Sequence, residues 1–353
     1  MSEGATAHSR GGWIGRHKAA TILLLLVVLL LGTVAAWATY LNSQISHVPR
    51  IDVGIKPPSE DNGGESSPSS AGRGLNILLA GTDTRNPGEL QKLVQSGWQP
   101  GSMRSDTIMV LHLTADRKKA YLISIPRDTW TSVPGYGHQK INAAFSFGGP
   151  KLYVQTIQDF TGLHIDHLAV IDWTGFKNLS SAVGGVDVNV PQTVTDPTNR
   201  VTWPKGIVHL EGQRALDYVR MRHGLPNGDF DRIARQQNFL RAMMGKILSS
   251  GTMTNPIRLT KTVHTMTAQL TVDSGFTNGR MRDLAFSLRH LRTRDVTFVT
   301  LPLKAYGRID GQSVVLVDQK KSEGLFGAAA ADELSTYLAK NDGSVLPAPG
   351  QVR

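Results

Sequence analysis

The stretch TIMVLHLTADRKKAYLISI, residues 107–125, decides the fold that the sequence predicts. It contains two apolar runs, Thr107–Leu113 and Ala120–Ile125, which are joined by the short polar segment TADRKK. Apolar runs of this length with a short polar joint are typical of two antiparallel strands connected as a hairpin. We therefore expect a β-hairpin here and build the fold outward from it.

Apolar patterns on both sides of the hairpin alternate between strand and helix spacing. NILLA, residues 76–80, predicts a buried strand, and residues 87–99 predict a loop or short helix. Further strands are expected at 168–172, 186–190, 296–301 and 313–317, and helices at 151–160, 174–183, 238–248, 259–270, 281–291 and 319–339. This alternation predicts an α/β fold of the α/β/α kind, in which helices flank a central mixed sheet.

Composition narrows the classes of function. The chain has 353 residues, which is enough for one large domain with appendages. It has no cysteine, so disulfides, thiolate chemistry and cysteine zinc sites are excluded. The formal charge of +10 suits an anionic partner, such as nucleic acid, anionic lipid or a phosphorylated glycan, without choosing among them.

The N-terminus predicts a single-pass membrane anchor. Residues 1–18 are polar and basic, and residues 19–41 contain the run ATILLLLVVLLLGTVAAWA, which is long enough to span a bilayer. Basic residues before the run place the N-terminus in the cytoplasm and the rest of the chain outside the cell membrane. Since Ala36-Trp37-Ala38 resembles a cleavage site, a cleaved signal peptide is the alternative.

A linker is expected to separate the anchor from the folded part. Residues 42–74 include DNGGESSPSSAGRG, which has almost no apolar residues and cannot form a core. We therefore predict a flexible linker over 42–74 and an extracytoplasmic domain over 75–345.

Charged residues gather at one predicted edge of the sheet. An antiparallel hairpin places the start of its first strand beside the end of its second, so Arg104 and Asp106 should lie next to Arg127. Arg104 and Asp106 are two residues apart, so an extended chain points them the same way. Asp83, which follows NILLA, should reach the same edge. Two carboxylates together with phosphate oxygens are ligands that Mg²⁺ accepts.

The stretch EGQRALDYVRMRHGLPNGDFDRIARQQ, residues 211–237, supplies more arginines. A helix over 211–219 is followed by a Gly/Pro break, and a second helix begins near Asp229. Arg220 and Arg222 follow the first helix, and Arg232 and Gln236 lie one turn apart on the second. Guanidinium groups match the oxygens of phosphate, so this stretch predicts a phosphate site.

Each of these residues also has a purely structural interpretation. Arg104 and Asp106 could form a surface pair, and Asp83 could be a turn former or helix cap. Arg220 and Arg222 could belong to a solvated face. The sequence has no HExxH, GxSxG or GxxxxGK[ST] pattern, so none of the corresponding zinc, serine-hydrolase or P-loop chemistries is indicated.

Taken together, six segments in order resemble the LytR-CpsA-Psr family of cell-wall glycopolymer transferases. The segments are LLAGTDTR (78–85), MRSDTIMVLHL (103–113), ISIPRDTW (123–130), PGYGHQKINAAFSFGG (134–149), AVGGVDVNVP (182–191) and LEGQRALDYVRMRHGLPNGDFDRIARQQ (210–237). Two departures are visible: Met103 replaces a usual Gly, and Ala143 follows Asn142 where a His is common. Neither departure changes a charged position.

The resemblance implies a specific activity. Members of the family transfer a glycan with one phosphate from a polyprenyl-pyrophosphate carrier to a peptidoglycan hydroxyl at the outer face of the membrane. By matching motif, Asp83 and Asp106 would hold Mg²⁺ or another divalent cation. The catalytic residues would be Arg104, Arg127, Arg220 and Arg222. The pyrophosphate would be bound by these four together with Arg232 and Gln236.

Two alternative functions share parts of this pattern. A hydrolase that cuts the same lipid pyrophosphate with water would use the same residues. A membrane-bound transcriptional regulator would fit the basic charge, but the chain has no recognisable nucleic-acid-reading motif, so no nucleic-acid partner is expected. The general base and the kind of glycopolymer are not indicated by the sequence.

Overall fold

The computed structural model describes residues 39–55, 73–84, 86, 88–226, 228–248 and 255–352. The predicted tail at 1–18, nearly all of the predicted anchor at 19–41 and residues 56–72 of the predicted linker lie outside this part of the chain. Within the described ranges, no helix is both long enough and apolar enough to cross a membrane.

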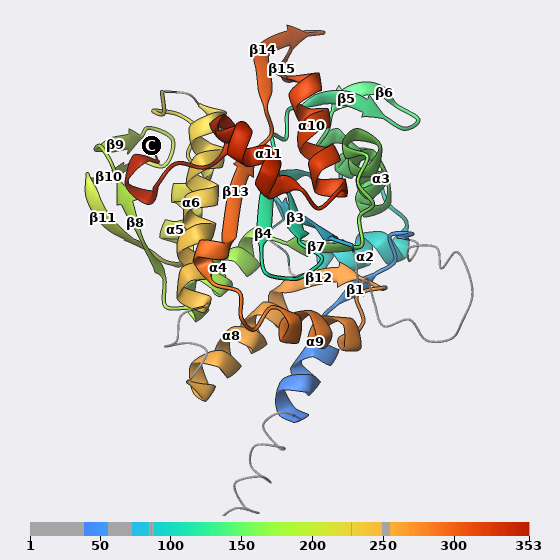
Figure 1. Ribbon diagram of the computed structural model, residues 1–353, viewed down its shortest axis with the longest axis vertical. Helices are drawn as coiled ribbons and strands as arrows, with labels where there is room; N and C mark the ends of the chain where they lie inside the picture. The colour runs from blue at the N-terminus through green and yellow to red at the C-terminus, as the bar shows by residue number, and fades with distance from the viewer. Residues whose placement is uncertain are drawn as a thin grey trace, which may run out of the picture.

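A seven-stranded mixed sheet lies at the centre of the molecule (Figure 1). In spatial order its strands are β1 (Arg50–Ile51), β12 (Leu270–Asp273), β7 (His167–Ile171), β2 (Leu75–Thr82), β3 (Ser105–Leu113), β4 (Ala120–Ile125) and β13 (Val296–Thr300). Strands β3 and β4 are antiparallel, with Ile108 opposite Ile125 and Leu113 opposite Ala120. The predicted hairpin and the mixed central sheet are both confirmed.

Helices cover both faces of the sheet because apolar side chains alternate along its strands. On β2, Leu78 and Ala80 join the cluster formed with α3, α10 and α11, whereas Ile77 belongs to a cluster on the other face. The first face carries α2 (Glu89–Ser96), α3 (Ala143–Thr161), α10 (Gln319–Ala330) and α11 (Leu334–Lys340). The second carries α6 (Asp229–Ile247) and α9 (Asn278–Ser287), with α4 (Trp173–Ala182), α5 (Gly212–Arg220) and α8 (Pro256–Gln269) beside them.

Several short strands lie outside the central sheet. The expected strand at 186–190 forms, as β8 (Val186–Val190), but it pairs with β11 (Gly206–Leu210) in a separate ribbon. A second ribbon joins β9 (Val194–Asp196) to β10 (Val201–Trp203). Two hairpins project from the molecule: β5 (Trp130–Val133) with β6 (Gly137–Lys140), and β14 (Leu303–Ile309) with β15 (Gln312–Val317).

The folded part begins earlier than the sequence predicts. Arg50 and Ile51 pair with β12, and Ile51 and Val53 are buried in the main core. Residues 50–53 are therefore part of the domain and not of a flexible linker. The predicted linker looked polar because its Gly/Ser-rich half outweighs this short apolar stretch.

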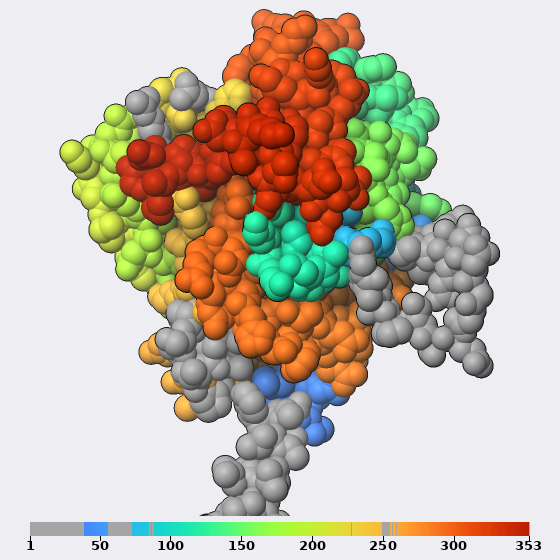
Figure 2. All heavy atoms as spheres, in the orientation of Figure 1, coloured from blue at the N-terminus to red at the C-terminus, as the bar shows by residue number. Residues whose placement is uncertain are grey.

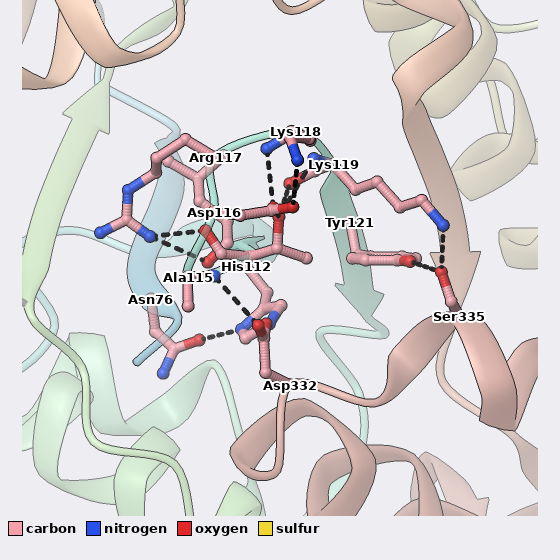
Figure 3. Close-up of polar contacts among 12 residues, drawn as sticks. Asn76, His112, Ala115, Asp116, Arg117, Lys118, Lys119, Tyr121, Asp332 and Ser335 are labelled. Atoms are coloured by element: carbon pink, nitrogen blue, oxygen red, sulfur yellow. Dashed lines mark hydrogen bonds and ion pairs between the residues drawn. The ribbon is translucent and has the colours of Figure 1, made fainter. Parts of the chain in front are cut away.

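The predicted helix over 319–339 is two helices, α10 and α11. Asp332 lies between them with φ of 60°, a left-handed conformation that Asp tolerates better than most residues. Its carboxylate lies 3.2 Å from His112 Nε2 and accepts a hydrogen bond of 3.0 Å from the Ala115 amide (Figure 3). The break is therefore held by contacts with the β3–β4 turn, which the helical pattern of 319–339 does not reveal.

Candidate active site at the edge of the central sheet

The start of β3 contains a bulge at one of the predicted metal ligands. Gly81 lies opposite Thr107 and Thr82 opposite Ser105, so Asp106 is an extra residue in the ladder. A bulge redirects the side chains around it and is common beside active sites. The regular alternation that the sequence argument assumed for this strand is therefore interrupted at Asp106.

Arg127 links the ends of β3 and β4, as the hairpin predicted. Its Nη1 donates to Asp106 Oδ1, and its Nε lies 3.8 Å from Asp128 Oδ2. Asp128 in turn pairs with Lys140, with 3.2 Å between carboxylate and ammonium. Burial lowers the pKa of the Arg127 guanidinium, but the carboxylates of Asp106 and Asp128 outweigh burial and raise it. Arg127 is thus a firmly charged cation at the sheet edge.

Asp83 lies at the same edge and is held by the backbone of Arg104. The Arg104 amide donates to Asp83 Oδ1 at 3.0 Å, and the Asp83 amide donates to the Arg104 carbonyl at 3.2 Å. The Arg104 side chain is exposed. The structure therefore places Asp83, Arg104, Asp106 and Arg127 together, as expected.

The second group of arginines comes from α5 and α6. Arg220 is the last residue of α5, and its guanidinium carbon lies 3.6 Å from the ring centroid of Trp173. Trp173 follows β7, whose carboxyl end lies at the same edge as that of β2, because the two strands are parallel. A cation over an indole face is an attractive pair, so Trp173 fixes Arg220 at this edge.

Asp229, at the start of α6, holds two of the predicted arginines. Its carboxylate accepts from Arg222 Nε at 2.8 Å and from Arg232 Nη2 at 3.0 Å. Arg232 is 5% exposed. Burial lowers the pKa of its guanidinium to about 10, against the opposing effect of Asp229, so Arg232 stays charged at neutral pH. The sequence offered a signal for this clamp, since Asp229 and Arg232 are three residues apart on a helix.

The two groups of arginines share one electrostatic environment. Arg127 and Arg222 also lower the pKa of Arg232, and Asp106 raises it. Asp229 likewise contributes to the raised pKa of Arg127. The sheet edge and the start of α6 therefore face a common site.

Several buried polar atoms at this site lack hydrogen-bond partners within the described part of the chain. They are Arg127 Nε, Arg232 Nε, Thr82 Oγ1 and Thr129 Oγ1. Leaving a buried donor unsatisfied costs about 1–3 kcal/mol, so native proteins rarely do so without a reason. Anionic oxygen atoms are one kind of partner that two guanidinium groups accept.

Gln236 contacts the end of α5 directly before Arg220. Its Nε2 donates to the Val219 carbonyl at 3.2 Å, so it braces the end of α5 against α6. Arg214 and Arg235, two further arginines of the same stretch, pack on aromatic rings elsewhere. Arg214 lies 5.1 Å from the Trp203 ring, and the fully buried Arg235 lies 4.6 Å from the Tyr218 ring.

Asp83 and Asp106 fit a magnesium ion by the chemistry of their oxygens. Each carboxylate has one oxygen engaged, by the Arg104 amide and by Arg127 respectively, and one oxygen without a partner among the described residues. The same residues contain no group of three or more metal-binding side chains. Mg²⁺ commonly binds through one or two carboxylates and completes its shell with water and phosphate oxygens, so two carboxylates are chemically compatible with the ion.

Comparison with known proteins places this architecture in one family. A sequence model of the LytR_cpsA_psr family matches residues 50–330. The probable cell wall biosynthesis protein LcpB of Corynebacterium glutamicum is 36% identical over 258 residues, which cover 72% of this chain and 61% of LcpB. TagU of Bacillus mycoides, a polyisoprenyl-teichoic acid–peptidoglycan teichoic acid transferase, is 35% identical over 221 residues, covering 62% of this chain and 67% of TagU.

A solved structure shares the fold. The crystal structure of TagV from B. subtilis superimposes with a TM-score of 0.60 and 25% identity, covering 74% of this chain and 97% of TagV. The chain spans about six tenths of the length of the first curated relatives that it matches. The matched residues 50–330 include the whole central sheet and both groups of arginines. This chain belongs to the LytR-CpsA-Psr family.

Proposed function

We propose that this protein transfers a glycopolymer, together with one phosphate, from a polyprenyl-pyrophosphate carrier to a hydroxyl group of peptidoglycan. The observation that carries the proposal is the pair of cations Arg127, which is partly buried, and Arg232, which is buried, because the Nε atom of each is buried without a hydrogen-bond partner among the described residues. A pyrophosphate offers oxygen atoms to both. The name of the TagU relative, which describes teichoic acid transfer to peptidoglycan, supports this choice of donor and acceptor.

The reaction is a displacement at phosphorus. The acceptor oxygen bonds to the phosphorus that carries the glycan, and the bond from that phosphorus to the bridging oxygen breaks. Polyprenyl phosphate leaves, and the acceptor hydroxyl loses its proton. Arg127 and Arg232 would stabilise the negative charge that grows on the phosphate oxygens, because preorganised cations act strongly where water is excluded. The pyrophosphate would also be bound by three exposed arginines, which are Arg104, Arg220 and Arg222.

Asp83 and Asp106 are the residues that would hold Mg²⁺ in this proposal. When bound, the ion would supply further positive charge to the phosphate oxygens. Asp106 would then serve two roles, since one of its oxygens stays with Arg127 and orients that guanidinium. Gln236 would act indirectly, by fixing the end of α5 that carries Arg220.

We also propose that the protein is anchored in the cell membrane. A lipid-linked donor requires a site close to a membrane, and the apolar run within residues 19–41 would supply a single-pass anchor. Basic residues before that run would keep the N-terminus in the cytoplasm and the catalytic domain outside.

The test is a transfer assay with the full-length chain in detergent. A radiolabelled glycan on polyprenyl pyrophosphate is incubated with and without peptidoglycan, in Mg²⁺ or in EDTA. We expect label to enter peptidoglycan only with the acceptor and Mg²⁺ present. Arg127→Ala should lower the rate by about 10²–10³-fold. Arg214→Ala, a change at an exposed arginine outside the site, is the matched control and should leave the rate unchanged.

Two results would contradict the proposal. Equal release of glycan phosphate into water with and without peptidoglycan would identify a hydrolase instead. A normal transfer rate in Arg127→Ala would show that the chemistry takes place elsewhere.

A further inference from the structure

Two exposed tyrosines stand on the two projecting hairpins beside the proposed site. Tyr306 in β14 is 54% exposed, and Tyr136 in the turn between β5 and β6 is 46% exposed. The hairpins form adjoining projections at the top of the molecule, orange for β14–β15 and blue-green for β5–β6 (Figure 2). Each tyrosine packs on a second aromatic ring, so neither is a loose surface side chain.

Tyr306 is fixed next to the clamp that holds Arg232. Its ring packs edge to face against Phe230, with 5.1 Å between centroids. Phe230 lies in the first turn of α6, between Asp229, which holds Arg222 and Arg232, and Asp231. Partial burial raises the pKa of the Tyr306 hydroxyl to about 12, with help from Asp229 and Asp231. The hydroxyl therefore stays protonated and can donate a hydrogen bond at neutral pH.

Tyr136 lies on the Arg104 side of the site. Its ring stacks on Phe147 of α3, with 4.6 Å between centroids and 24° between planes. The neighbouring Ser146 carbonyl accepts hydrogen bonds of 3.0 Å from the Gly101 amide and from Trp98 Nε1. These bonds tie the aromatic pair to the loop that leads into Arg104.

Both hairpins are joined to the strand end that carries the charged centre. The Val315 amide of β15 donates to the Asp128 carbonyl at 2.8 Å, and Thr129 forms a bridge with Val315. Asp128 directly follows Arg127. The two aromatic pairs, Tyr306–Phe230 and Tyr136–Phe147, therefore lie at two hairpins that meet next to Arg127.

The surroundings favour a sugar polymer as the occupant of these aromatic pairs. An isoprenoid chain would need a continuous apolar groove, but Lys304, Arg308 and His138 are exposed on the same hairpins. A sugar ring has an apolar CH face that suits an aromatic ring and hydroxyl groups that suit nearby polar side chains. Tyrosine is well adapted to such contacts, because it is rigid, amphipathic and carries a hydrogen-bonding tip.

We propose that Tyr306 and Tyr136, each with its aromatic partner, bind the glycan strand of the peptidoglycan acceptor on both sides of the reacting hydroxyl. This inference rests on the proposed function, because that function supplies the acceptor. Two separated aromatic pairs suit an extended polymer better than one small headgroup. Tyr306 and Tyr136 are then positioning residues that bring an acceptor hydroxyl toward the phosphorus near Arg127 and Arg232.

The test measures acceptor binding without any donor. Soluble N-acetylglucosamine–N-acetylmuramic acid oligosaccharides, released from peptidoglycan by a muramidase, are titrated calorimetrically into the full-length chain. We expect Tyr306→Ala and Tyr136→Ala each to weaken binding about five- to tenfold, because each removes the aromatic surface of one pair. Tyr306→Phe keeps the ring and should retain most of the binding. Phe286→Ala, a change at a 67% exposed aromatic on α9, is the control and should bind as wild type.

A second measurement separates this inference from the proposed function. In the transfer assay, Tyr306→Ala should raise the acceptor KM about five- to tenfold and leave the donor KM unchanged. Wild-type binding of the oligosaccharides by both Tyr→Ala variants would overturn the inference, as would a rise confined to the donor KM. Tyrosine-dependent binding without any transfer would instead contradict the proposed function and leave the glycan site standing.

Discussion

The two ends of the central sheet differ in the hydrogen-bond partners of their buried polar groups. At the β3–β4 turn, His112 is 1% exposed and lies between Asn76 and Asp332, at 2.8 and 3.2 Å (Figure 3). Asp332 also accepts from the Ala115 amide, so these groups satisfy one another. At the other end, Arg127 and Arg232 each keep a buried donor without a partner. Polar groups that complete their own contacts stabilise the fold, whereas a buried donor left without a partner costs stability.

The two ends of the sheet also differ in the charges that surround their buried ionisable groups. Arg232 lies among cations, and Arg127 and Arg222 help to lower its pKa. Like charges gathered in a partly buried site repel one another, which costs stability unless an anion is bound. At the opposite end, by contrast, the carboxylates of Asp332 and Asp166 face His112 and favour its charged form. In the proposed function, a bound phosphate would relieve this repulsion at the site end.

Removing Asp106 should produce the largest effect on activity. Asp106→Ala deletes one predicted metal ligand and the carboxylate that orients Arg127. We expect transfer to fall by about 10³-fold, since charge stabilisation of the phosphate is lost. The Asp106 side chain is 28% exposed, so the melting temperature should change little. A transfer assay paired with thermal unfolding checks this, and near-normal turnover would remove Asp106 from the site.

Removing Asp229 should produce the largest effect on stability. Asp229→Ala leaves the Arg232 guanidinium, which is 7% exposed, without its carboxylate partner. Breaking a buried pair from one side costs about 3–5 kcal/mol, measured as the free energy of unfolding in urea. Asp187→Ala removes an exposed carboxylate that pairs with His209 and should cost less than about 0.5 kcal/mol. Equal unfolding free energies of the two variants would show that the Asp229–Arg232 pair does not stabilise the fold.

Removing the Asp332 contacts at the opposite end of the sheet should lower stability and leave activity unchanged. Asp332→Gly suits the positive φ of this position but removes the contacts to His112 and Ala115. We expect a loss of about 1–3 kcal/mol in unfolding free energy. Transfer per folded molecule should match wild type, because Asp332 lies at the end of the sheet away from Arg127. A large drop in specific activity would show that the two ends are coupled.

The smallest effect should be on how stability depends on pH. Burial lowers the pKa of His112 below its ordinary value of 6.5, against the opposing effects of Asp332 and Asp166 and with a smaller contribution from Arg117. The unfolded chain then binds more protons than the folded one, so stability should fall as the pH drops below 6.5. Urea unfolding between pH 7.5 and about 5.5 should give a flatter profile for His112→Gln than for wild type. Identical slopes would indicate that His112 does not titrate with folding.

The sequence located the charged residues more reliably than it oriented them. Antiparallel pairing of two apolar runs was enough to place Asp106 beside Arg127, because strand register follows directly from a short turn. Helical spacing placed Gln236 one turn from Arg232, but it did not reveal that the Gln236 amide donates to the Val219 carbonyl. Local periodicity states which side of a helix a residue occupies, but the neighbouring helix decides which atom it contacts.

By itself, the sequence determined the hairpin and the mixed α/β class, since these follow from apolar periodicity, and it indicated the family, since its motifs stand in order. Only the tertiary structure decided that Trp173 holds Arg220 and that Asp106 lies at a bulge in β3. It also decided that residues 50–53 complete the sheet and that Asp332 divides the last long helix. Each of these depends on a partner distant in the sequence, and no local pattern records such a partner.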